Sequence, residues 1–227
     1  MSKFSNLFIQ HLLTFFLIVA SVKASATRQT PDKVIYHGKE YSLEINPLED
    51  YFFRNPGRPK GGIISTGLWR GYIATFEIRD SQLFLKDIQI QVIDSLDKDG
   101  NNVYKLKSVL NEVFPNRKEI KIDWLNRVLV LQYGEFIKFD WQLNPVQENC
   151  ILLEIEKGDL KKTKNLKFAE FDEFVEIQFS LLKKTADYEK AKTKVMNFYN
   201  VVWMNEQNVD RAIREYFFEY IPKILED

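Results

Sequence analysis

Apolar and polar residues alternate with a period of two through much of the middle of the chain. The alternation is strict in 87–92, and in 72–79 every second residue is apolar. A strand that is half buried in an antiparallel sheet requires this pattern. Further segments with strand-forming composition are 83–85, 119–124, 127–133, 135–141 and 150–155. The sequence therefore predicts a β-rich part that continues to about residue 157.

Turn residues separate several of these strands. His37–Glu40 divides 34–36 from 41–45, which predicts a β-hairpin with a glycine in its turn. Asp97–Asn102 predicts a second turn, because Asp, Asn and Gly favour tight reversals of the backbone. The segment 54–62 is rich in proline and glycine, and we expect it to form an irregular loop.

The hydrophobic period changes toward the C-terminus. Apolar residues three and four positions apart predict helices over 171–182, 187–203 and 208–221, with Asp172 as the N-cap of the first. A short helix is also expected over 108–114, before a proline.

Strands followed by helices indicate an α+β fold, in which an antiparallel β-sheet of several meander hairpins is followed by a C-terminal helical block packed on it. We expect 1–26 to be a signal peptide, 27–157 a β-rich part, and 158–227 a helical part that shares one core with it. The lysine-rich segment 158–165 is the expected junction.

The N-terminal segment has the pattern of a secretory signal peptide. Lys3 precedes the apolar run Leu12–Val22, which is followed by small residues at Ala24 and Ala26. This run is shorter than the ~20 residues that cross a bilayer, although an uncleaved anchor is the alternative. The chain has no Asn-x-Ser/Thr site. We therefore expect a bacterial protein that is exported to the periplasm or secreted, with no integral membrane segment after cleavage at Ala26.

Composition and charge narrow the choice of partner. The 227 residues are 45% apolar and 14% aromatic, which is typical of a globular domain, and the formal net charge is zero. Loss of the leader removes only Lys3 and Lys23, leaving 30 basic and 32 acidic residues. Such a balance does not predict binding to nucleic acid. Residues 157–194 carry ten basic and seven acidic residues, which predicts a solvated helical face or, alternatively, a docking surface for an acidic partner.

Few residues in the chain could carry catalysis or hold a metal. After the leader, His37 is the single histidine, and its place in a turn favours a solvated side chain over a catalytic base. Cys150 is the single cysteine and precedes three aliphatic residues, so we expect a buried, unreactive thiol. Zinc needs three or four nitrogen or sulfur ligands, and Asp97–Asn101 lacks the spacing of a calcium loop. We predict no metal and no cofactor.

One segment combines residue types that are common on recognition surfaces. Trp69 and Arg70 lie between two glycines directly before Tyr72, and Arg58 belongs to the preceding loop. Trp and Arg often dominate binding energies, through flat apolar area and bidentate hydrogen bonds. We take these four residues as the candidate binding site. The alternative is structural, with Trp69 in the core and Arg70 paired with an acid such as Glu77.

The sequence favours a non-enzymatic role. We expect an exported, soluble protein that binds a protein partner in the cell envelope or exterior, as an inhibitor or immunity-type protein does. The first alternative is a carbohydrate- or lipid-binding module. The second is a carboxylate-based glycoside hydrolase, which needs two acids ~5–9 Å apart. The residues that these alternatives would use are Trp69, Trp124 and Trp141 for the module, and Glu77 with Asp87 or Asp123 with Asp140 for the hydrolase.

Overall fold

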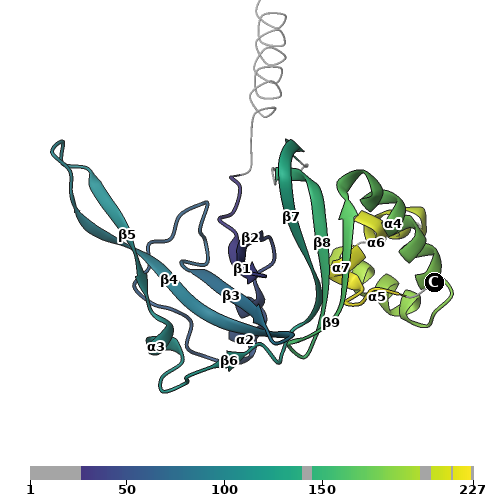
Figure 1. Ribbon diagram of the computed structural model, residues 1–227, viewed down its shortest axis with the longest axis horizontal. Coiled ribbons are helices and arrows are strands. Elements are labelled where there is room, and N and C mark those ends of the chain that lie inside the picture. The colour runs from purple at the N-terminus through teal and green to yellow at the C-terminus, as the bar shows by residue number, and fades with distance from the viewer. Residues whose placement is uncertain (1–26, 140–144, 200–205, 216, 226–227) are drawn as a thin grey trace, which may run out of the picture.

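The computed structural model describes residues 27–139, 145–199, 206–215 and 217–225, which form a mixed sheet and a set of helices (Figure 1). The predicted signal peptide lies outside the described residues. The strands are β1 Asp32–Tyr36, β2 Lys39–Leu43, β3 Ile73–Arg79, β4 Gln82–Leu96, β5 Asn102–Ser108, β6 Ile120–Lys121, β7 Asn126–Phe139, β8 Pro145–Glu156 and β9 Asp159–Lys167. The helices are α2 Pro47–Arg54, α3 Leu110–Val113, α4 Phe168–Leu182, α5 Asp187–Tyr199, α6 Glu206–Glu215 and α7 Phe217–Tyr220.

The strands form one sheet in the order β2-β1-β3-β4-β9-β8-β7, with β5 and β6 also paired to β4. The expected α+β class is confirmed in its broad sense, but the sheet is mixed and not wholly antiparallel. β1 and β3 are parallel, with Val34 opposite Phe76. The reason is the long connection through α2 and the loop 55–72, which returns the chain beside β1 in the same direction.

The predicted hairpin and turn are both present. His37 and Gly38 connect β1 to β2 in a two-residue turn, and both have a positive φ (48° and 75°), as a turn of this kind requires. In the second turn, the Asp97 carboxylate accepts hydrogen bonds from the backbone N–H groups of Asp99 and Asn101. These contacts hold the pKa of Asp97 below its ordinary value.

Most of the expected junction at 158–165 is instead part of β9, which begins at Asp159. This strand pairs with β8 from Asn149 opposite Lys167 to Glu156 opposite Asp159. The lysines of β9 obscured its pattern. The strand pairs with β4 only at Asp159 opposite Gln82, so most of its length is exposed like an edge strand and tolerates charge. Helix α4 then begins at Phe168, so Asp172 lies inside the helix and is not its N-cap.

Buried apolar residues form two clusters, and β7 and β8 contribute different side chains to each of them. The first cluster includes Leu129 and Leu153 together with apolar residues of β1, β3 and β4. The second includes Val128 and Leu152 together with apolar residues of α4 to α7. Cys150 to Leu153 are consecutive and all buried, which accounts for the unbroken apolar run in β8.

Candidate functional site

Trp69 lies on the surface, held there by a tight turn. Leu68 donates its N–H to the carbonyl oxygen of Ser65, and Gly71 donates to that of Leu68. The turn buries Leu68 and leaves Trp69 51% exposed. The alternative in which Trp69 packs into the core is therefore not what the structure shows.

Trp69 borders a cavity of about 360 Å³ at the start of α2. The segment Asn46-Pro47 ends the β2 region and begins the helix, with proline in the first turn, where its missing N–H is not needed. The indole N–H of Trp124 donates to the carbonyl oxygen of Pro47 at 2.9 Å and fixes this end of the helix. The polar and aromatic residues that line the cavity are Glu44, Asn46, Glu49, Asp50, Trp69 and Arg127.

Two of the predicted site residues orient one wall of this cavity. Arg58 donates to both carboxylate oxygens of Glu49, at 2.8 and 2.6 Å, and the Tyr72 hydroxyl donates to Oε1 of Glu49 at 2.6 Å. Burial and the adjacent Glu49 carboxylate both raise the pKa of Tyr72, so the phenol remains a donor. Arg58 and Tyr72 thus fix the position of Glu49.

Arg70 has a different environment from the other three. Its side chain is fully buried and donates to Oδ1 of Asp32 at 2.9 Å and to the carbonyl oxygen of Thr30 at 2.7 Å. The same Oδ1 accepts the N–H of Ala74 at 2.8 Å. Burial raises the pKa of Asp32 to about 6, against the opposing effect of Arg70. The Asp32 carboxylate therefore ties β1 to β3, and Arg70 holds this carboxylate and does not line the cavity.

The sequence did not identify Glu44, Asp50 and Arg127 as site residues. Glu44 forms an ion pair with Arg28 at 2.8 Å, whereas Asp50 makes no ion pair with another residue that the structure describes. Glu44 directly follows β2, Asp50 lies in α2 and Arg127 lies at the start of β7. No local motif links them, because only the folded sheet brings β7 beside the β2–α2 connection.

Of the residues of the alternative functions, Glu77 and Asp87 lie on the paired strands β3 and β4, where Asp87 is opposite Thr75, two residues from Glu77. Each of the two acids has a polar partner of its own. Glu77 forms an ion pair with Lys86 at 3.1 Å, while Asp87 accepts the hydroxyl of Ser108 at 2.6 Å. Trp124 packs against Tyr51, with ring centroids 4.7 Å apart, so it is not a second exposed platform beside Trp69. Asp140 and Trp141 lie outside the described residues.

Comparisons with known proteins find no matching family model, no matching curated protein and no matching solved structure. Over the ranges that the structure describes, no three His, Cys, Asp or Glu side chains are grouped to hold a metal ion. Within the same ranges, no helix has the length and apolar character needed to span a membrane. The candidate site must therefore be interpreted from its own geometry.

Proposed function

We propose that this chain is an exported, non-enzymatic protein that binds a protein partner, and that the cavity beside Trp69 receives a basic side chain of that partner. The supporting observation is a half-exposed indole beside three carboxylates and the guanidinium of Arg127 around a single cavity. Two of the carboxylates are already paired with arginines, and Asp50 makes no ion pair with another described residue. A Lys or Arg side chain can stack on the indole face while its charge meets the carboxylates.

The geometry supports recognition because the wall of the cavity is already ordered. Glu49 is held by three hydrogen bonds from Arg58 and Tyr72, so it would lose little conformational freedom on binding. Asp50 lies one residue further along α2 and is exposed to solvent. Its carboxylate supplies a negative charge for a cationic group that enters beside Trp69.

The partner can be sought by placing a photoreactive residue in the cavity. Trp69→benzoylphenylalanine should crosslink a protein of the cell envelope, and the same substitution at Phe53 should not. Phe53 is the matched control, because it is 90% exposed on α2 but does not line the cavity. With the partner in hand, Trp69→Ala should weaken binding by roughly 30-fold or more. Crosslinking that is equal at both positions would contradict the proposal.

A carbohydrate is the second candidate ligand of the same cavity. An exposed indole can stack on a sugar ring, and Asn46, Asp50 and Arg127 can hydrogen-bond with its hydroxyl groups. A glycan array separates the two candidates. Binding of a glycan that is lost in Trp69→Ala and kept in Phe53→Ala would replace the protein-partner proposal.

Export and the place of the helices belong to the same proposal. The leader pattern supports transfer to the periplasm or exterior, and N-terminal sequencing of the mature protein should find Thr27 as its first residue.

We also propose that α4 to α7 form a block packed on the sheet, supported by the buried cluster that they share with Val128 and Leu152.

A further inference from the structure

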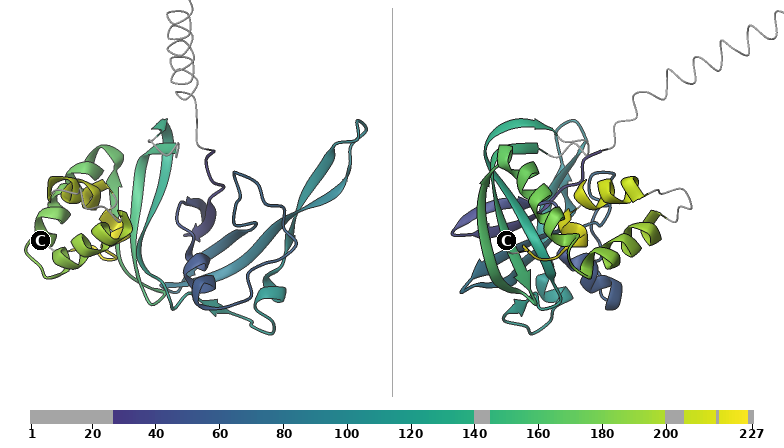
Figure 2. Two further views of the ribbon diagram at one scale, coloured as in Figure 1. Left: turned by 180° about the vertical axis from the view of Figure 1, so that it is seen from behind. Right: turned by 90° about the vertical axis from the view of Figure 1, so that its right-hand side faces the viewer.

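The two ends of the sheet approach each other without pairing. β2 and β7 stand at opposite ends of the strand order, so each pairs on one side only with the strands that the structure describes. The sheet curls, and the rings of Tyr41 and Tyr133 lie edge to face across the gap, with centroids 6.4 Å apart. β7 lies between β2 and the C-terminal helices both in Figure 1 and in the view from behind in Figure 2.

A cavity of about 230 Å³ with an apolar lining lies beside this unpaired edge of β7. Leu43 of β2, Val128 of β7 and Val175 of α4 line it together with Phe217 and Phe218 of α7, and all five side chains are at most 9% exposed. Protein interiors are closely packed, so an apolar cavity of this size between a sheet and helices is a place where apolar ligands bind.

The lining residues of β7 set the length of the cavity. They extend from Arg127 to Gln132, five residues apart, which is roughly 16 Å in an extended strand. At ~30 Å³ for each water-sized group, the cavity holds about eight such groups. A volume that is small for its length fits one unbranched chain of about eight carbon atoms better than a fused ring system.

Arg127 supplies an unpaired positive charge at one end of the cavity. Its side chain is half-buried and makes no ion pair or hydrogen bond with another residue that the structure describes. The other charged residues of the lining are Glu44, Arg214 and Glu215. Glu44 and Arg214 are already in ion pairs, while Glu215 is exposed to solvent at the end of α6. A half-buried guanidinium without a partner favours a carboxylate, which it can bind through two parallel hydrogen bonds.

We propose that this cavity binds a medium-chain carboxylic acid, with its alkyl chain along β7 and its carboxylate on Arg127. The cavity shares Glu44, Ile45 and Arg127 with the Trp69 cavity, but Trp69 does not line it. The ligand is a small molecule, so the inference goes beyond the protein partner proposed above and does not depend on it.

The experiment compares three probes that carry the same chain of eight carbon atoms: octanoate, 1-octanol and octylamine. In isothermal titration calorimetry of the full chain, octanoate should bind at one site and at least about tenfold more tightly than the other two, because only its headgroup pairs with Arg127. Octylamine that binds as tightly as octanoate would show that the acids of the lining control the cavity, and would overturn the proposal. The absence of octanoate binding at millimolar concentration would overturn it too.

Substitution of Arg127 tests the place of the carboxylate. Arg127→Gln should weaken octanoate binding about tenfold and leave the affinity for 1-octanol unchanged, which also shows that the cavity is still formed. Arg54→Gln is the matched control, because Arg54 is exposed on α2 and does not line the cavity. Octanoate binding that is equal in the unmodified chain and in Arg127→Gln would overturn the proposal.

Substitution of Val130 tests the place of the alkyl chain. Val130 lines the cavity and is half-buried, so Val130→Phe should fill part of the space and weaken both octanoate and 1-octanol about tenfold. Octanoate binding that survives this change in a folded variant would place the ligand elsewhere and overturn the proposal. Trp69→Ala should leave octanoate binding unchanged, so that failure of this inference can be told from failure of the protein-partner proposal.

Discussion

At the scale of single residues, the Arg70–Asp32 pair shows what the sequence could and could not indicate. An arginine between two glycines suggested an exposed recognition side chain, yet Arg70 is buried and holds Asp32 at 2.9 Å. Asp32, the first residue of β1, precedes Arg70 by 38 residues, and no local pattern joins them. Trp69, by contrast, is exposed, although the sequence left open whether it packs into the core or lies at a binding site. Pairing across the sheet is the information that the sequence lacked.

Removal of the Arg70 guanidinium should destabilise the fold strongly. Arg70→Met leaves the Asp32 carboxylate buried without its cation, a change that typically costs about 3–5 kcal/mol. The matched variant Arg58→Met opens a partly exposed pair and should cost less than about 1 kcal/mol. Urea unfolding of both variants gives the comparison. Equal losses of stability would show that the Arg70 pair has no special structural role.

The raised pKa of Asp32 predicts a specific dependence of stability on pH. In the unfolded chain this carboxyl has its ordinary pKa of 3.8, whereas in the fold it is about 6. Between these values the folded state holds a proton that the unfolded state has lost. The contribution of this proton to the free energy of unfolding is thus fully present below about pH 4 and is lost as the pH rises through 6. The loss amounts to at most about 3 kcal/mol.

The measurement compares the unmodified protein with Asp32→Asn, so that the contributions of the other carboxyl groups to the pH dependence cancel. The free energy of unfolding of the unmodified protein, minus that of the variant, should decrease from pH 4 to pH 7. A difference that is constant or increases over this range would mean that Asp32 is already ionised in the fold at pH 4.

The thiol of Cys150 should be unreactive in the native protein. Its side chain has no exposed surface, and burial raises its pKa to about 11, so little thiolate exists at pH 8. A disulfide reagent should modify it at least about 100-fold more slowly than it modifies the new thiol of Met196→Cys, since Met196 is 49% exposed. Equal rates in the folded state would contradict the buried position.

At the scale of elements, the sequence predicted most strands and helices but not their ends. The β4 strand was expected as two short pieces and is continuous to Leu96, because its last residues belong to a projecting arm formed with β5 and have no core to set their pattern. The segment 119–124 was expected to be a full strand, but only Ile120 and Lys121 pair, with β4. Alternation predicts burial correctly only where a strand faces one core and one solvent side.

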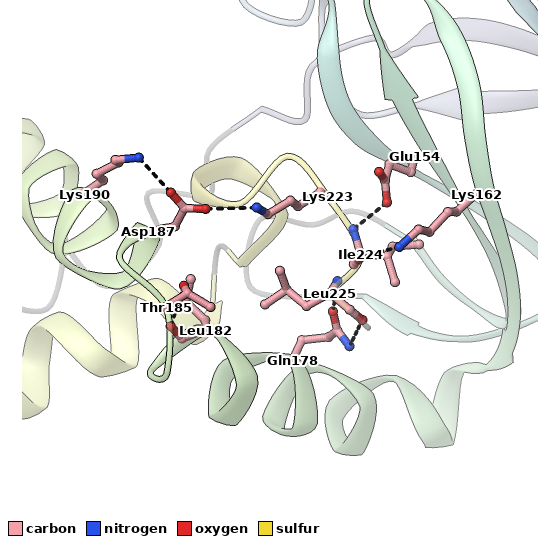
Figure 3. A network of polar contacts seen from close by, with 10 residues as sticks. All are labelled: Glu154, Lys162, Gln178, Leu182, Thr185, Asp187, Lys190, Lys223, Ile224 and Leu225. Carbon is pink, nitrogen blue, oxygen red and sulfur yellow. Dashed lines mark hydrogen bonds and ion pairs between the residues drawn. The ribbon is translucent and has the colours of Figure 1, made fainter. Parts of the chain in front are cut away.

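The C-terminal segment illustrates a contact that no periodicity could reveal. Gln178 of α4 is buried, accepts the N–H of Leu225 at 2.7 Å and donates to its carbonyl oxygen at 3.2 Å (Figure 3). Glu154 of β8 accepts the N–H of Ile224 at 2.7 Å. Side chains from a helix and a strand thus satisfy the backbone of a segment that has no regular structure of its own.

Substitution of Gln178 should release this segment. Gln178→Ala removes both hydrogen bonds to Leu225 and leaves its backbone groups without their partner, at a cost of about 1–3 kcal/mol. Hydrogen exchange should rise first at residues 221–225. Gln207→Ala is the control, because Gln207 is exposed on α6. Protection of 221–225 that is unchanged in Gln178→Ala would show that the apolar contacts of Ile221 and Ile224 suffice.

At the scale of the whole molecule, β7 and β8 connect the two buried clusters. Leu152 belongs to the cluster with the helices and Leu153 to the cluster with β1, β3 and β4, and both are fully buried. A strand that is buried on both sides cannot lose one cluster without exposing apolar residues of its own. We therefore expect the helices and the sheet to unfold together.

Two neighbouring substitutions test this coupling. Leu152→Ala and Leu153→Ala each remove a fully buried side chain, and each should cost about 2–5 kcal/mol. Because the two clusters share β8, both variants should show one unfolding transition in urea. The far-ultraviolet circular dichroism of the helices and the fluorescence of Trp124, which packs on the first cluster, should therefore change at the same midpoint. If Leu152→Ala instead separates an early loss of helix from a later loss of the Trp124 signal, the helices are a unit that unfolds independently of the sheet.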